Sequence, residues 1–116
     1  MIINGVEIEI DFTDADTIEK IDSGNKEVLN KVKELEENIE NIEPAEGIRQ
    51  ECKILKEFLD YVIGEGTSEK IFGKKNSLKE CLKAFEDIIN ERNRQFDNLQ
   101  NVVEKYSPDR LQRWIY

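Results

Sequence analysis

IEKIDSGNKEVLNKVKELEENIENI, residues 18–42, places its apolar side chains on a seven-residue repeat. One position of the repeat holds Ile18, Val32 and Ile39, and the position three residues later holds Ile21, Val28, Leu35 and Ile42. Asn25 is the only polar residue in this set. A narrow apolar stripe flanked by charged side chains is typical of a helix that packs along another helix. The stretch therefore predicts a protein whose function is contact with other polypeptides.

Composition indicates a single, thin, helical domain. The chain has 116 residues, of which 38% are hydrophobic and 37% are charged, so any core must be built from narrow apolar stripes. Its 17 Lys and Arg face 26 Asp and Glu, and the net charge of −9 disfavours binding to nucleic acid. No run of about 18 apolar residues that could span a membrane occurs, and no signal peptide is recognisable. We expect a protein that is made and kept in the cytoplasm.

The residues that usually carry catalysis are scarce. The chain has no histidine, and its two cysteines, Cys52 and Cys81, lie inside helical apolar patterns without the spacing of a metal site. Buried thiols are the favoured interpretation of these cysteines, and a disulfide is the alternative. The glycine and lysine residues between Gly66 and Lys75 lack the spacing of a phosphate-binding loop. We therefore expect no catalytic residues, no metal and no cofactor, and a protein that is not an enzyme.

The first twelve residues predict a β-hairpin. Val6, Ile8, Ile10 and Phe12 alternate with acidic residues, and Asn4-Gly5 supplies the positive φ angles of a two-residue turn. In this register Ile3 faces Val6 and Met1 faces Ile8, which leaves residues 9–12 beyond the short first arm. Two outcomes remain open for that overhang. It packs on the helices of its own chain, or it adds to the sheet of a neighbour.

The remaining sequence predicts a mainly α fold, in which the N-terminal hairpin is followed by three principal helices and a short C-terminal helical turn. The expected segments are a first, coiled-coil-like helix at 14–43, a second at 44–63, a short helical turn at 67–72, a third helix at 78–106 and the last turn at 108–116. Capping residues before Ala15 and at Ser77, and a proline at Pro44, set the expected starts.

Ser23-Gly24 and Asn25 leave two alternatives for the first helix. A glycine inside a helix costs about 1 kcal/mol relative to alanine, so the helix could break there and Asn25 would cap its second half. If the helix is continuous, Asn25 occupies a core position, where it could fix the register of a coiled coil.

Three segments resemble known proteins. The opening Ile3-Asn4-Gly5-Val6-Glu7-Ile8-Glu9-Ile10-Asp11-Phe12 resembles the start of small tail-assembly chaperones of siphophage-type tails. The segments Gly64-Glu65-Gly66-Thr67-Ser68-Glu69-Lys70-Ile71-Phe72-Gly73 and Tyr106-Ser107-Pro108-Asp109-Arg110 are similar to a group of proteins from prophages of Gram-positive bacteria, associated with tail genes. The resemblance spans most of the chain, and its motifs are structural.

This resemblance implies a non-enzymatic chaperone in the cytoplasm of a bacterial host. Such proteins cover apolar helical segments of a tape-measure protein and recruit tail-tube subunits. We expect self-association and partner contacts through two sets of residues: Ile8, Ile10 and Phe12 in the strand, and Tyr106, Arg110 and Trp114 near the C-terminus. Two other functions remain open. One is a structural coiled-coil component or adaptor that stays in a phage-like particle, and the other is a small acidic inhibitor of a host protein.

Overall fold

The computed structural model describes residues 1–105. Its elements, in chain order, are β1 (Ile2–Ile3), β2 (Val6–Glu7), α1 (Ala15–Glu37), the 3₁₀ turn η1 (Ile39–Asn41), α2 (Pro44–Val62), α3 (Thr67–Phe72) and α4 (Leu78–Val103). This confirms the predicted mainly α fold with an N-terminal β-hairpin. The predicted last turn at 108–116 lies outside the described residues.

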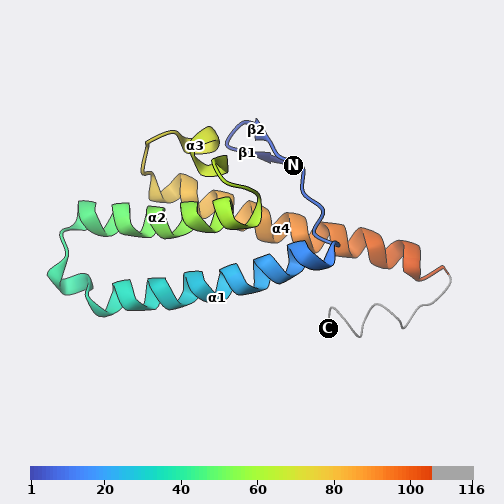
Figure 1. Cartoon of the computed structure of the whole chain (residues 1–116), viewed down its shortest axis with the longest axis horizontal. Helices are drawn as coiled ribbons and strands as arrows, with labels where there is room; N and C mark the ends of the chain where they lie inside the picture. Colours follow the sequence, from blue (N-terminus) through green and yellow to red (C-terminus); the bar gives the residue numbers. More distant parts are fainter. Residues whose placement is uncertain (106–116) are drawn as a thin grey trace.

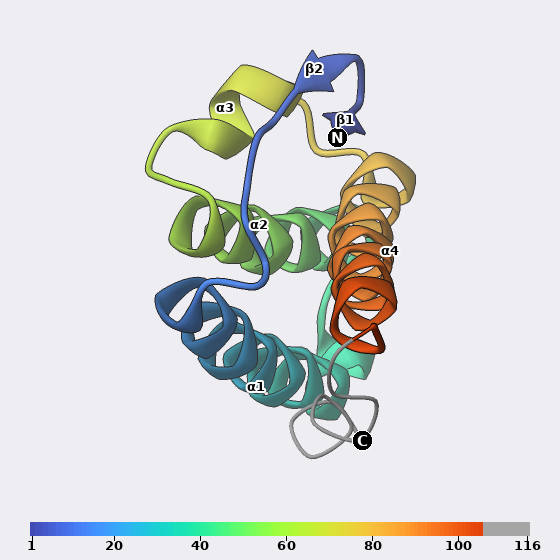
Figure 2. The ribbon, with the colours of Figure 1, turned by 90° about the vertical axis from the view of Figure 1, so that its right-hand side faces the viewer.

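Helices α1 and α2 form an antiparallel pair joined at one end by η1, and α4 packs on a different face of α2 (Figure 1). Seen end-on, the three helices occupy the corners of a triangle, with the β-hairpin and α3 together above α2 and α4 (Figure 2). The hairpin and α3 therefore cover the side of α2 and α4 that faces away from α1 (Figure 2).

One apolar core joins the hairpin, α3 and the helices. Its fully buried side chains include Ile3, Phe12, Leu59 and Ile88. At the contact between α2 and α4 the rings of Phe58 and Phe85 lie 5.0 Å apart, centroid to centroid. Both cysteines are free thiols buried in this core, as predicted: Cys52 on α2 and Cys81 on α4. Burial, followed by a hydrogen bond to Cys52, raises the pKa of Cys81 to about 12.

The N-terminal hairpin has the predicted turn and register. Asn4 and Gly5 have φ angles of 48° and 80°, and Ile3 pairs with Val6. Met1 and Ile8 exchange two hydrogen bonds, from the Met1 ammonium to the Ile8 carbonyl (2.9 Å) and from the Ile8 amide to the Met1 carbonyl (2.8 Å). The register expected from the sequence is therefore confirmed.

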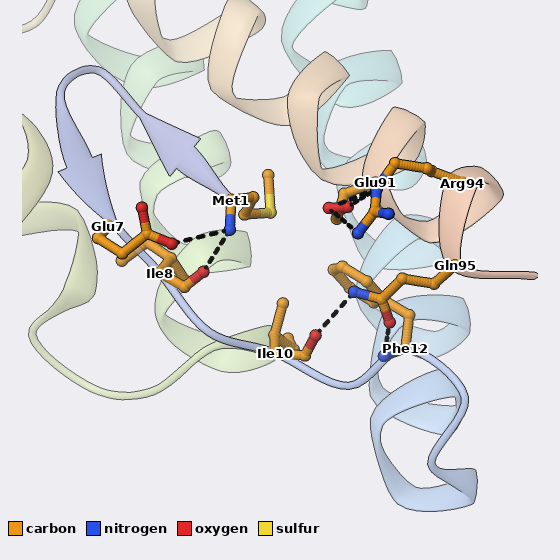
Figure 3. Close-up of polar contacts among 8 residues, drawn as sticks. All are labelled: Met1, Glu7, Ile8, Ile10, Phe12, Glu91, Arg94 and Gln95. Atoms are coloured by element: carbon orange, nitrogen blue, oxygen red, sulfur yellow. Dashed lines mark hydrogen bonds and ion pairs between the residues drawn. The ribbon is translucent and has the colours of Figure 1, made fainter. Parts of the chain in front are cut away.

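The prediction that strand continues to residue 12 is wrong. Strand β2 ends at Glu7, Ile8 makes the last pair with the first arm, and residues 8–12 form an extended strap that runs toward the start of α1. The side-chain amide of Gln95 on α4 holds the strap: its Nε2 donates to the Ile10 carbonyl (2.9 Å), and its Oε1 accepts from the Phe12 amide (2.8 Å) (Figure 3). The strap therefore packs on its own helices, and the alternative in which it adds to a neighbour's sheet is not the arrangement found.

Helix α1 is continuous through Ser23-Gly24, so of the two alternatives the one with a break there is not the arrangement found. A β-carbon at Gly24 would lie 3.1 Å from the ring of Phe58, and the glycine thus lets α1 and α2 approach closely. Asn25 lies inside the helix and is half-buried, so it does not act as a cap.

The ends of α1 differ in part from expectation. At the start, Asp14 alone is the cap and accepts from the Asp16 and Thr17 amides. At the other end the helix stops at Glu37, earlier than the predicted residue 43, because the chain turns at Asn38, whose side chain donates to the Glu34 carbonyl (3.1 Å).

The other helices begin where the sequence predicts. Pro44 occupies the first turn of α2, and Ser77 caps α4 by accepting from the Glu80 amide. Helix α3 has no side-chain cap of its own, and Asp60 of α2 instead accepts from both the amide and the hydroxyl of Ser68. Helix α4 ends at Val103, slightly before the predicted residue 106.

Candidate binding groove

The apolar repeat of residues 18–42, which continues past the end of α1 through η1, is divided between two environments. In its first half Ile21 and Val28 are buried in the core. In its second half Leu35 and Ile42 are only half-buried, and Ile39 is 57% exposed. Figure 1 shows the cause, since α1 and α2 are close near Gly24 and diverge toward η1. The second half of the stripe therefore lacks a complete partner within the described chain.

A groove of about 700 Å³ opens between the diverging helices. Its floor contains the half-buried side chains of Leu35, Ile42 and Ile54. Polar and charged side chains form the rim: Lys31, Glu34 and Asn38 from α1, and Glu46, Arg49, Gln50, Lys53 and Glu57 from α2. An apolar floor with a charged rim suits one face of an amphipathic helix.

The rim is electrically neutral although the chain is strongly acidic. It carries three basic side chains (Lys31, Arg49 and Lys53) and three acidic ones (Glu34, Glu46 and Glu57), whereas the whole chain has a net charge of −9. A surface of this kind repels an acidic partner less than the rest of the molecule does.

One ion pair crosses between the two helices at the inner end of the groove. Lys31 Nζ lies 3.0 Å from Glu27 and 3.2 Å from Glu57 on α2. Hydrogen bonds to Glu27 and to Glu57 raise the pKa of Lys31, which remains a cation at neutral pH. Beyond this pair lies a smaller hollow of about 200 Å³, which shares Lys31, Glu57 and Ile54 with the groove and continues to Gly24. The two hollows thus follow the same line between α1 and α2.

The strand residues predicted to contact partners are mostly inside the molecule. Phe12 is completely buried, and Ile8 is 7% exposed. Ile10 is half-buried against the core, and its carbonyl is bound by Gln95 (Figure 3). In this fold Ile8 and Phe12 are unavailable to a partner, because they anchor the strap to the helices. The predicted contacts Tyr106, Arg110 and Trp114 lie outside the described residues.

Sequence reasoning did not single out the groove. Leu35 and Ile42 were visible as members of the seven-residue repeat, but nothing in the repeat shows which of its members α2 leaves uncovered. Nothing in the sequence pattern of the second helix marked Ile54 as part of a groove. The rim residues matched the ordinary pattern of a solvated helix face.

Two further features of residues 1–105 concern metal ions and membranes. This part of the chain contains no group of three or more acidic, cysteine or histidine side chains arranged to hold a metal ion. None of its helices combines the length and apolar character needed to cross a membrane.

Comparison with known proteins gives a family and no function. No curated protein matches the chain, and no solved structure does. The sequence profile of one family, described as a family of unknown function (DUF6673), matches residues 4–115, which is nearly the whole chain. The chain therefore belongs to the DUF6673 family.

Proposed function

We propose that this protein is a non-enzymatic chaperone of phage tail assembly that binds apolar helical segments of a partner such as a tape-measure protein. The observation that carries the proposal is the groove between α1 and α2, where an apolar floor is left uncovered beside a charged rim. The resemblance of the opening and of two later segments to tail-region proteins supplies the choice of partner.

The dimensions of the groove support a helical ligand. From Lys31 to Asn38 the α1 side of the groove covers two helical turns, about 10 Å at a rise of about 1.5 Å per residue. A bound helix could place apolar side chains at positions i, i+3 or i+4, and i+7 over Leu35, Ile42 and Ile54. The groove would therefore cover a short stretch of a long apolar helix, and several copies would be needed to cover more.

The charge of the chain supports a role in keeping an apolar partner dispersed. Once the groove is filled, the complex presents a surface with a large excess of acidic side chains. Net charge far from zero opposes association between such complexes.

Co-expression with a tape-measure protein from the same genome tests the proposal. The wild-type chain is expected to keep the tape-measure protein in the soluble fraction and to co-purify with it. Ile42→Asp places a carboxylate on the groove floor and should abolish this effect. Leu82→Asp, on an exposed site of α4 away from the groove, should not.

Circular dichroism of both variants shows whether they remain folded. An insoluble tape-measure protein in the presence of the wild-type chain would contradict the proposal. If Ile42→Asp captured the tape-measure protein as well as the wild type does, the groove would not be the binding site.

Purified particles distinguish the chaperone from a structural component. A chaperone should be absent from finished particles by mass spectrometry, whereas a coiled-coil component or adaptor should be present. An inhibitor would instead retain a host protein, and not a tail protein, in a pull-down from host lysate.

A further inference from the structure

We propose that two copies of this chain associate through the open ends of their α1–α2 pairs, with Ile39 of each copy seated in the groove of the other. This inference concerns the chain alone and does not require the proposed tail partner. The second copy is the occupant of the groove.

Ile39 is placed to act as the inserted side chain. It lies on η1 at the tip of the helix pair, and 57% of its surface is exposed. Asn38 and Ile42, on either side of η1, both line the groove. An exposed apolar side chain next to an apolar hollow is what a two-fold contact needs, because each copy then offers both the insert and the receiving site.

Charge favours this surface over the rest of the molecule. Two chains of net charge −9 repel each other over most orientations. The groove rim, with three acids and three bases, is neutral, so contact there brings together surfaces without a net charge of one sign.

The apolar repeat supplies the side chains that the contact would bury. Leu35, Ile39 and Ile42 continue the stripe that Ile21 and Val28 bury against α2. Two copies meeting at their η1 ends would cover the apolar side chains that each copy leaves exposed there.

Analytical ultracentrifugation of the purified chain tests the proposal. The wild type is expected to reach twice the 13.6 kDa chain mass as its concentration rises. Ile39→Asp should remain a monomer over the same range, because it would place a carboxylate in the apolar groove of the second copy. The matched control Leu82→Asp alters a side chain of similar exposure on α4 and should still dimerise.

Both variants should keep the helical circular dichroism of the wild type, since both sites are exposed. A wild type that stays monomeric overturns the proposal. It is also overturned if Ile39→Asp dimerises as well as the wild type, or if Leu82→Asp dissociates the dimer to the same extent.

Ionic strength provides a second readout. Because the contact surface is neutral while the rest of the chain is acidic, salt screens repulsion between copies more than it weakens the contact. The dimer should therefore become tighter as salt concentration rises. A dimer that dissociates with added salt would contradict a contact made through a neutral rim and an apolar floor.

If the groove also binds a tape-measure helix, and this step rests on the proposed function, the second copy and the helix compete. Ile39→Asp should then lose the dimer while still capturing the tape-measure protein, because its groove floor is intact. Ile42→Asp should lose both. A dimer that captures no tail protein would overturn the proposed function alone, and a monomeric wild type that captures it would overturn the dimer alone.

Discussion

The two ends of the α1–α2 pair differ in how completely the chain covers its own apolar surface. Near Gly24 the helices are in close contact, and the strap, the β-hairpin and α4 bury the side chains around them. Near η1 the same two helices diverge and leave Leu35, Ile39 and Ile42 partly or largely exposed. The apolar repeat of residues 18–42 therefore serves the core with its first half and offers its second half, at the end of α1 and around η1, as a surface.

This difference separates residues that maintain the fold from residues free to bind. A substitution at the covered end removes contacts on all sides of a side chain, so it should lower stability. A substitution at the open end removes few contacts and should change association instead.

The largest effect is expected at Phe12, the last residue of the strap, whose side chain is completely buried. Phe12→Ala should lower the free energy of unfolding by about 3–5 kcal/mol, because it removes a whole ring and leaves a cavity. Leu35→Ala, at the half-buried groove floor, should cost about 1 kcal/mol, since less apolar surface returns to water. Urea denaturation of both variants measures the two losses. Similar losses would mean that the open end is as important to the fold as the covered end.

The attachment of the strap by Gln95 should have the next largest effect. Gln95→Leu removes the partners of the Ile10 carbonyl and the Phe12 amide, and should lower the free energy of unfolding by about 1–3 kcal/mol. Hydrogen exchange should show faster exchange at the Phe12 amide. Gln50→Leu alters an exposed amide on the groove rim and serves as the control. Unchanged protection of Phe12 in Gln95→Leu would show that its apolar anchors hold the strap without the amide.

The two helical glycines at opposite ends of the pair should respond in different directions to alanine. At Gly47 an added β-carbon would lie 3.8 Å from Ile42, an ordinary contact, so Gly47→Ala should raise stability by about 0.5–1 kcal/mol. At Gly24 the added atom would lie 3.1 Å from the Phe58 ring, and the resulting strain should cancel or exceed this gain. Denaturant midpoints measure both. A gain at Gly24 equal to that at Gly47 would show that the close contact is not tight.

Much of the fold follows from local signals that the sequence displays. Pro44 and Ser77 set the starts of α2 and α4, and Asn4-Gly5 sets the hairpin turn, because each acts on its own stretch of backbone. The heptad repeat correctly predicts a helix with an apolar stripe. It does not predict the close approach of α1 to α2 at Gly24, since that depends on Phe58 of another helix.

The strap and the groove could not be predicted in this way. Alternating apolar residues from Val6 to Phe12 are equally compatible with a strand and with an extended strap, and the deciding partner, Gln95, lies 83 residues from Phe12. The alternation alone therefore led to Ile8 and Phe12 as partner contacts. The groove depends on the angle between α1 and α2, which no single segment encodes.

The smallest effect in the accessible pH range concerns the covered contact between α2 and α4. Burial raises the pKa of Cys81 from 9.0 to about 12, so the native state holds the neutral thiol more strongly than the unfolded chain does. This stability is fully present below pH 9 and is lost progressively as pH rises from about 9 toward 12, at roughly 1 kcal/mol per pH unit. Urea denaturation at pH 8 and pH 9 should therefore show an alkaline loss that is about 0.4 kcal/mol larger for the wild type than for Cys81→Ala. Because Cys52 is the hydrogen-bond partner of Cys81, the difference between the proteins reports on this thiol pair, and equal losses would mean that its ionisation is not linked to unfolding.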